Sequence, residues 1–313
     1  MKPNLTWHSA TLVAIALVLC SMELSASEPS DPRSRYRRFD DAICRFLMDG
    51  MDSTYVRVPS TSWEIPVVTK MYGYGMHITP GSDALALDSG VCAEVGLGIG
   101  YHGLDLVITQ PVGHGIPFNF EFDYYDNYWG LGINVSDRSF GGELFGEAPG
   151  GGSELQTSSV LLDGYIALNG SKYSYPAAIY GNYVQVRSAG SPLINIWYEH
   201  SSCTPFSTRA AALLGECSLD EAAVTAGYGY NLSISEGKVL LNASAGVGTL
   251  LPAFGLAANA RAGAVLWIND NLRLGCSLTG FYHRSWSGRD MYLEALSCRG
   301  FVNVTYCFGN NGK

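Results

Sequence analysis

Val224-Thr-Ala-Gly-Tyr-Gly-Tyr-Asn-Leu232 belongs to the stretch that decides the fold, which runs from Glu221 to Phe308. Every second residue of this segment is apolar or aromatic, and the residues between are small or polar. The same alternation continues in four further segments: 239–247, 256–268, 272–282 and 296–308. Strict alternation over about ten residues is the period of a β-strand whose two faces meet different surroundings. The stretch therefore predicts consecutive β-strands.

The length of these strands separates two classes of β-protein. Strands of a soluble sandwich usually run about five to six residues, whereas a tilted membrane-spanning strand needs roughly nine to eleven. One face here ends in Tyr and Phe, and the other is small or charged, as expected between lipid and a polar lumen. We therefore predict an all-β fold, a transmembrane antiparallel up-and-down β-barrel. A soluble periplasmic or surface β-sandwich stays open as the alternative.

The composition agrees with one large β-domain. The chain has 313 residues, with 37 glycines, 19 tyrosines and only 15% charged residues. Its formal net charge of -9, without a run rich in Lys and Arg, argues against nucleic acid as a partner. After the N-terminal segment, no apolar run approaches the roughly 18 residues of a membrane-spanning helix. Closed β-structure is then the remaining way to span a membrane, because lipid offers no partner to an open strand edge.

The N-terminal segment predicts export. Lys2 supplies a positive charge, residues 10–19 are apolar, and Leu24-Ser25-Ala26 is a candidate cleavage site, as in a signal peptide. Cys20 leaves lipidation open as an alternative, although Leu19 stands where a small residue is preferred. This pattern places the mature protein in the cell envelope.

We expect three parts along the chain: a signal peptide (1–27), a periplasmic lead-in (28–62) and an outer-membrane β-barrel (63–313). The lead-in has apolar residues at three- and four-residue spacing after a group of arginines, which predicts a short helix.

Cysteines and histidines offer little chemistry. Of the eight cysteines, seven follow the signal peptide, and an odd number leaves at least one free thiol or an intermolecular bridge. Cys203 and Cys217 flank a loop-like stretch, and a disulfide between them would stabilise the fold by about 3 kcal/mol. No Cys-x-x-Cys or His-x-x-x-His spacing occurs, so we expect neither a metal nor another cofactor.

Two motifs suggest enzymatic alternatives. Gly98-Ile-Gly-Tyr-His-Gly103 matches the dinucleotide fingerprint in letters, but a strand pattern follows where the fingerprint needs a helix, so we interpret it as strand. His283 stands beside Ser285 and Ser287, which leaves a lipid-acting outer-membrane enzyme as an alternative function. Other candidate general bases are His102 and His114.

Strand parity locates the loops. Both termini of such a barrel lie on the periplasmic side, so the strand number is even. We expect about twelve strands, within a range of about ten to fourteen. They lie near 72–79, 82–101, 103–110, 117–126, 129–137, 158–168, 192–200, 221–233, 238–249, 256–269, 272–283 and 294–308. A bend or bulge is expected near Ser89-Gly90.

One long segment, residues 169–191, falls on the periplasmic side, where short turns are expected. If it contained a further membrane strand, the strand number would be odd. We therefore predict that it does not span the membrane but packs in or under the lumen.

Charged side chains are expected to point into the lumen. By the alternation, the first half of the chain supplies the carboxylates Glu94, Asp105, Glu121, Asp123 and Asp163, and the second half supplies Arg261, Arg273 and Arg299. Charges in a small enclosed lumen are costly unless they are paired. One hypothesis is a network of ion pairs that plugs the lumen. The alternative is a wet channel in which each charge is solvated.

Several patches resemble a family of Gram-negative outer-membrane proteins described only as a domain of unknown function, family 4421. The most specific is Lys172-Tyr173-Ser174-Tyr175-Pro176-Ala177-Ala178. Further patches are Asp52-Ser-Thr-Tyr-Val-Arg57, Gln185-Val-Arg-Ser-Ala-Gly190, Gly227-Tyr-Gly-Tyr-Asn231, 269–282 and 301–309. The resemblance covers nearly everything after the signal peptide. It implies an outer-membrane barrel and supplies no catalytic residues.

These observations lead to an outer-membrane β-barrel with a structural role, or one that passes or binds small solutes. We expect a non-enzymatic role. The expected partners are the lipid of the outer membrane and the barrel-assembly machinery, which would engage the aromatic end of the last strand at Phe308.

Overall fold

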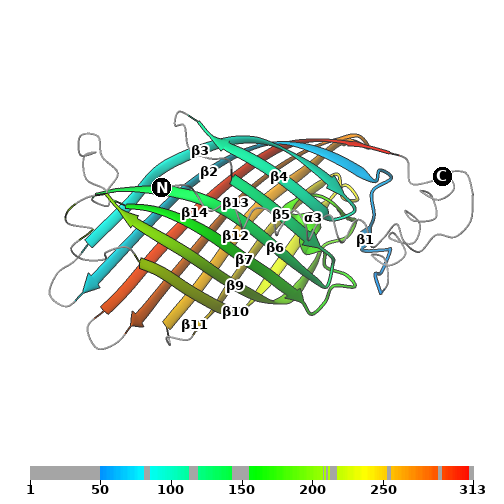
Figure 1. Cartoon of the computed structure of the whole chain (residues 1–313). Coiled ribbons are helices and arrows are strands. Elements are labelled where there is room, and N and C mark those ends of the chain that lie inside the picture. Colours follow the sequence, from blue (N-terminus) through cyan, green and yellow to red (C-terminus); the bar gives the residue numbers. More distant parts are fainter. Residues whose placement is uncertain are drawn as a thin grey trace, which may run out of the picture. The chain divides into compact units, whose positions relative to one another are not determined.

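Twelve antiparallel strands form a closed barrel, which confirms the predicted fold class (Figure 1). The computed structural model describes residues 50–80, 85–112, 119–142, 155–206, 208, 211, 217–251, 255–287 and 291–309. They all belong to one compact unit, Asp41–Lys313. The predicted signal peptide, the lead-in helix, Cys20 and His114 lie outside the described residues.

The barrel strands follow the chain as an up-and-down meander. Their bounds are β2 (Trp63–Pro80), β3 (Leu85–Tyr101), β4 (Leu104–Pro111), β5 (Asn119–Tyr125), β6 (Trp129–Gly142), β7 (Leu155–Ala167), β9 (Ala189–Pro205), β10 (Cys217–Ile234), β11 (Val239–Leu251), β12 (Gly255–Asn269), β13 (Leu272–Ser287) and β14 (Met291–Phe308). The last strand, β14, pairs with the first, β2, from Met291↔Pro80 to Phe308↔Trp63 and so closes the ring.

The first strand corrects the prediction, because β2 begins at Trp63 and not near residue 72. Ile65 and Val67 are exposed on the outer surface, and Glu64 and Lys70 are buried on the inner one. The alternation therefore continues through this segment, although Pro66 and the two charges interrupt its apolar pattern.

Two local irregularities agree with the sequence. The register of β2 against β3 shifts between Gly73 and Gly75, opposite Ser89 and Gly90, which confirms the predicted bulge. The Tyr74 backbone N–H donates to Ser89 Oγ at 2.9 Å. The stretch with the dinucleotide pattern is strand β3 followed by a two-residue turn, in which His102 and Gly103 have φ of 48° and 87°. Positive φ at both central positions is the requirement of a tight hairpin.

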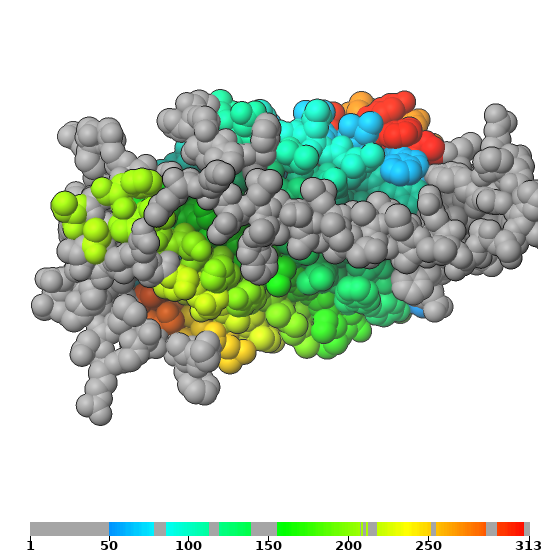
Figure 2. Space-filling view, in the orientation of Figure 1, coloured from blue at the N-terminus to red at the C-terminus, as the bar shows by residue number. Residues whose placement is uncertain are grey.

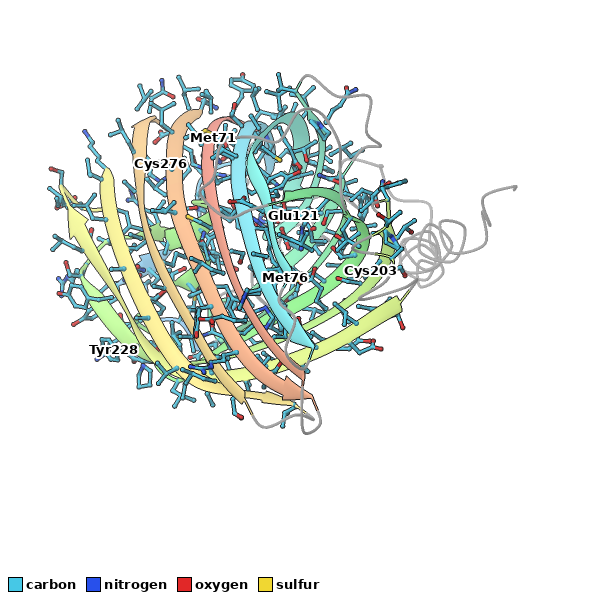
Figure 3. The ribbon with its side chains drawn as sticks, turned by 90° about the vertical axis from the view of Figure 1, so that its left-hand side faces the viewer. Met71, Met76, Glu121, Cys203, Tyr228 and Cys276 are labelled. Carbon is cyan, nitrogen blue, oxygen red and sulfur yellow. The ribbon has the colours of Figure 1, made fainter. Side chains whose placement is uncertain are left out.

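The two faces of the barrel wall differ as the alternation predicts. On the outer face Tyr228 and Leu278 are both 55% exposed, whereas the inward-facing Thr225 and Arg273 are 3% and 1% exposed. Tyr228 and Cys276 point away from the barrel in Figure 3, and Glu121 lies inside it. Figure 2 shows one side of the outer surface, where cyan residues of the first strands adjoin green residues of the middle strands.

One apolar face of strand β2 points into the barrel and not toward its outer surface. Tyr74 and Met76 of β2 pack against Leu87, Leu155 and Cys203 in a cluster within the barrel. The lumen therefore holds an apolar core of its own, in addition to its charges.

Residues 169–188, which we call the plug, connect β7 to β9 and form no barrel strand, as predicted. They contain the short helix α3 (Tyr175–Ile179) and the bridge strand β8 (Val184–Gln185). Strand β8 pairs with β1 (Val56–Arg57) and with no strand of the barrel. Ser174 caps α3, since its Oγ accepts from the Ala177 N–H at 3.2 Å, and Pro176 occupies its first turn.

The plug lies at the same end of the barrel as β1 and the short strand-connecting turns, which we call the closed end (Figure 1). The opposite end, where residues 81–84, 143–154 and 252–254 connect the strands, is called the loop end. No helix in the described part of the chain is long and apolar enough to cross a membrane.

Candidate functional site

Gln185 holds the plug together from within. The side chain is 1% exposed. Its Oε1 accepts from the Ser174 backbone N–H at 2.9 Å and from Asn231 Nδ2 of β10 at 3.1 Å. Its Nε2 lies within hydrogen-bond distance of three carbonyl oxygens, those of Lys172 (2.7 Å), Arg187 (2.8 Å) and Tyr55 (3.2 Å). One amide thus joins the lead-in, the plug and the barrel wall.

Arg273 of β13 ties the plug to the wall at the closed end. Its two terminal nitrogens donate to the two carboxylate oxygens of Glu64 at 2.8 and 2.5 Å, and Nη1 also donates to the Gly181 carbonyl at 2.8 Å. A Cβ at position 181, where φ is +74°, would lie 2.7 Å from Arg273 Cδ, so glycine is required there. Asn182 Nδ2 donates to Asp105 of β4 at 2.5 Å.

Further contacts reach the plug from other sides of the wall. Tyr180 donates its hydroxyl to Asp123 of β5 at 3.0 Å, and Asn242 of β11 donates to the Ala178 carbonyl at 2.8 Å. The ring of Tyr175 lies 4.0 Å from that of Tyr165 on β7. Because strands from opposite sides of the barrel all bond to the plug, it fills the lumen at the closed end.

Toward the loop end the plug borders a cavity of about 250 Å³. Its lining includes Tyr175, Ile179 and Tyr180 of the plug and aromatic residues such as Trp197 and Phe281 from the wall. It is also lined by eight charged residues: Lys70, Glu94, Glu121, Arg138, Asp163, Glu199, Arg261 and Arg299. Figure 3 shows Glu121 among the side chains inside the barrel.

Part of this charge is neutralised directly. Lys70 of β2 forms an ion pair with Glu121 of β5 across the lumen. Arg138 Nη1 lies 2.9 Å from Glu199 Oε1, and the Arg138 guanidinium stacks over the Tyr74 ring. The remaining buried carboxylate of this group, Glu94, accepts from Thr109 Oγ1 at 2.6 Å and from the Asn119 amide.

Three further charges lack such partners. Arg261 donates only a long hydrogen bond of 3.4 Å to Ser277 Oγ, and its buried Nε has no partner. Within the described part of the chain, Arg299 and Asp163 make neither an ion pair within 4.0 Å nor a hydrogen bond. These three side chains line the cavity without a close ion pair, and Arg299 and Asp163 attract each other from a longer distance.

The eight charges that the sequence predicted in the lumen separate into two places. Asp105, Asp123 and Arg273 contact the plug, whereas Glu94, Glu121, Asp163, Arg261 and Arg299 line the cavity. Their direct ion-pair partners are Lys70 for Glu121 and Glu64 for Arg273. Lys70 and Glu64 were not among the predicted lumen charges, because the first strand was expected to begin after both. The pair Arg138–Glu199 was not predicted either.

Among the described side chains, no nucleophile is bonded to His283. His283 is 1% exposed, its Nδ1 lies 3.3 Å from Glu221 Oε1, and its ring lies beside those of Trp197 and Phe281. Among the described residues no hydrogen bond joins it to Ser285. The side chain of Ser287 lies outside the described residues. His102 occupies the turn at the closed end, away from this cluster.

Cys203 and Cys217 lie directly opposite each other in the pairing of β9 with β10. The disulfide between them stays a prediction. Within the described ranges, no group of three or more His, Cys, Asp or Glu residues is placed to hold a metal ion.

Comparison with solved structures gives several outer-membrane proteins of low similarity. Among solved structures, the chain is similar to the translocator domain of the autotransporter NalP from Neisseria meningitidis (12% identity, 88% of this chain and 97% of that one, TM-score 0.37). It is also similar to the outer membrane protease OmpT from Escherichia coli (7% identity, 80% and 97%, TM-score 0.38). Likenesses at this level carry no argument about activity, and the barrel fold rests on the strand pairing described above.

The sequence comparisons are more specific. No curated protein matches the chain. The family described as "Domain of unknown function (DUF4421)" matches residues 50–253, which include the plug and the first nine barrel strands in full. Because this match covers more than half of the 313 residues, the chain belongs to the DUF4421 family.

Proposed function

We propose that the protein is an outer-membrane β-barrel that is closed by its plug and binds a small polar solute in the lumen. It does not act as an open pore. The observation that carries this proposal is the plug itself, which Arg273, Asp105, Asp123 and Asn242 hold from four different strands. A water-filled passage would leave these inward groups solvated, whereas here they bond to the backbone and side chains of residues 178–182.

The outer surface supports the membrane location. Large apolar side chains are exposed all around the ring, among them Leu97 (61%), Val247 (65%) and Leu296 (55%). Near the closed end the exposed aromatics include Trp129 (45%) and Tyr306 (55%). An apolar band with aromatic residues at its edge is the surface that lipid covers and that water disfavours.

Conductance tests the closed lumen. The purified chain inserted into planar lipid bilayers should show no steady current, because the plug blocks the passage. A variant in which a short Gly-Ser linker replaces residues 173–187 should open a stable pore. Arg273→Ala should give intermittent opening, whereas Arg284→Ala, which removes an exposed arginine from the same strand, should not. Steady wild-type current equal to that of the linker variant would overturn the proposal.

Fractionation tests the location independently. The protein should sediment with the outer membrane, need detergent for extraction, and migrate faster on gels before boiling than after. A mature chain that stays in solution without detergent would instead support the alternative of a soluble sandwich.

A further inference from the structure

We propose that the cavity binds a small zwitterion, with its carboxylate on Arg261 and Arg299 and its ammonium group on Asp163. This inference rests on the proposed function in one respect, namely that the lumen holds a solute. It names the chemical class of that solute from the placement of three cavity charges that form no ion pair within 4.0 Å among the described residues.

The two arginines form an anion-binding row. The strand registers pair Arg261 with Thr279 and Thr279 with Arg299, so the three residues lie side by side on β12, β13 and β14. All three line the cavity. Neighbouring strands lie about 4.8 Å apart, so the two arginines start roughly 10 Å from each other with the threonine hydroxyl between them. One carboxylate in that gap can accept from both guanidinium groups, which is the geometry that arginine recognises best.

Asp163 faces this row from the other wall. It lies on β7, and in the barrel order five strands separate β7 from β14 in either direction. Arg299 and Asp163 are therefore on opposite sides of the lumen, with the cavity between them. An ionised carboxylate only accepts hydrogen bonds, so Asp163 needs a donor from whatever occupies the cavity.

The remaining cavity charges act on these three groups only from beyond ion-pair distance, where Glu121 attracts both arginines and Asp163 attracts Arg299. Glu121 and Glu199 are bound to Lys70 and Arg138, and Glu94 accepts two hydrogen bonds from neighbouring side chains. The charges without a close ion pair are therefore Arg261 and Arg299 on one side of the lumen, the positive wall, and Asp163 on the other side, the negative wall. A purely anionic ligand would be repelled by Asp163, and a purely cationic one by the arginine row. A ligand with both charges pairs with the two walls at once. This pairing offsets the free-energy cost of burying the three side-chain charges.

The size and floor of the cavity limit the ligand further. About 250 Å³ is less than the roughly 300–1,000 Å³ of pockets that hold drug-sized molecules. The Arg261 guanidinium lies over the Tyr175 ring, 5.9 Å from its centroid, so a plug residue borders the arginine row. A molecule of amino-acid size fits this space and this charge pattern.

Matched ligand series test the assignment on the detergent-solubilised full chain. Glycine, β-alanine and γ-aminobutyrate carry increasing charge separation, and each is compared with its acid lacking the amine (acetate, propionate, butyrate) and with the amine lacking the acid. Binding is measured by calorimetry and by the fluorescence of Trp197, which lines the cavity. At least one zwitterion should bind about tenfold or more tighter than both of its matched compounds.

Two substitutions assign the contacts. Arg299→Gln and Asp163→Asn should each weaken the preferred zwitterion about tenfold or more. Asp163→Asn should leave the affinity for the matched acid unchanged or higher, because it removes only the negative wall. Lys238→Gln, at the closed-end turn, serves as the charge-removing control. If Arg299→Gln does not fold, Arg299→Lys keeps the charge, loses the fork of donors, and should still weaken binding.

Equal binding of acid and zwitterion in all three series, or an unchanged zwitterion affinity in Asp163→Asn, would overturn the assignment. An affinity for acids alone would show an anion site and would overturn it as well. Failure of the closed-barrel proposal is visible separately, as steady wild-type conductance in bilayers, whatever the ligand preference.

Discussion

Arg273 and Arg299 lie on the neighbouring strands β13 and β14 and both face the lumen, yet the protein uses them differently. Arg273, at the closed end, is bonded to both oxygens of Glu64 and to the plug backbone at Gly181. Arg299, at the cavity, has no direct ionic partner among the described residues. A buried charge that is fully bonded rigidifies its surroundings, and one that is left open is available to a ligand. The same residue type thus marks the sealed region and the binding region.

The largest effect should come from breaking the sealed end. Arg273→Ala leaves Glu64 as an unpaired buried carboxylate, which costs about 3–5 kcal/mol. Urea unfolding followed by heat-modifiable gel migration measures this loss. Arg299→Ala should cost much less, since no direct ion pair is lost. Equal destabilisation by the two variants would erase the distinction between the two regions.

The rim of the loop end offers a second test. If Cys203 and Cys217 form a disulfide, reduction should lower the free energy of unfolding by about 3 kcal/mol. Alkylation of the unfolded, unreduced protein followed by mass spectrometry should then leave both thiols unlabelled. Labelling of both residues before reduction would exclude the bridge. Cys276→Ser, which changes an exposed cysteine on the outer face, is the control.

Gln185→Ala tests the internal support of the plug. The substitution leaves buried donors and acceptors without a partner, and each such group costs about 1–3 kcal/mol. Because the amide links Tyr55, Ser174 and Asn231, the plug should loosen while the barrel persists. Hydrogen exchange should increase in residues 172–188 and stay unchanged in β12 and β13. Gln110→Ala, at an exposed position of β4, should have no such effect.

The smallest effect concerns the lead-in and depends on pH. The Thr54 hydroxyl and backbone N–H donate to Asp52 Oδ1 at 2.6 and 3.0 Å, and these hydrogen bonds lower the pKa of that carboxyl below its usual 3.8. A carboxyl with a lowered folded-state pKa stabilises the fold above its unfolded-state pKa and loses this contribution as the pH falls through the folded-state value.

The thermal midpoint of Asp52→Asn should therefore lie slightly below that of the wild type at pH 7 and meet it near pH 3. Asp270→Asn, an exposed aspartate in another closed-end turn, should show no such convergence. A difference that grows on acidification would contradict this assignment.

Alternation predicted the barrel because every strand separates lipid from lumen. Each second residue must therefore be apolar, and the residues between must suit the lumen. Parity likewise predicted that residues 169–191 leave the wall. What the sequence could not supply was pairing between inward side chains on strands that are not adjacent. Lys70 meets Glu121, and Glu64 meets Arg273, 209 positions along the chain. Such contacts depend on strand order and stagger, which no local pattern encodes. Starting the first strand too late removed Glu64 and Lys70 from consideration altogether.

The bond between Arg273 and Glu64 has a consequence for assembly. These residues lie on β13 and β2, the strands on either side of β14, so their contact spans the seam where the last strand meets the first. In a sheet that has not yet closed, β13 and β2 stand near opposite edges, and the guanidinium and carboxylate cannot meet. The bond also fixes Gly181. Ring closure and formation of this bond are therefore one event, and a nascent barrel that is still open at its seam lacks the tie that Arg273 and Glu64 together give the plug.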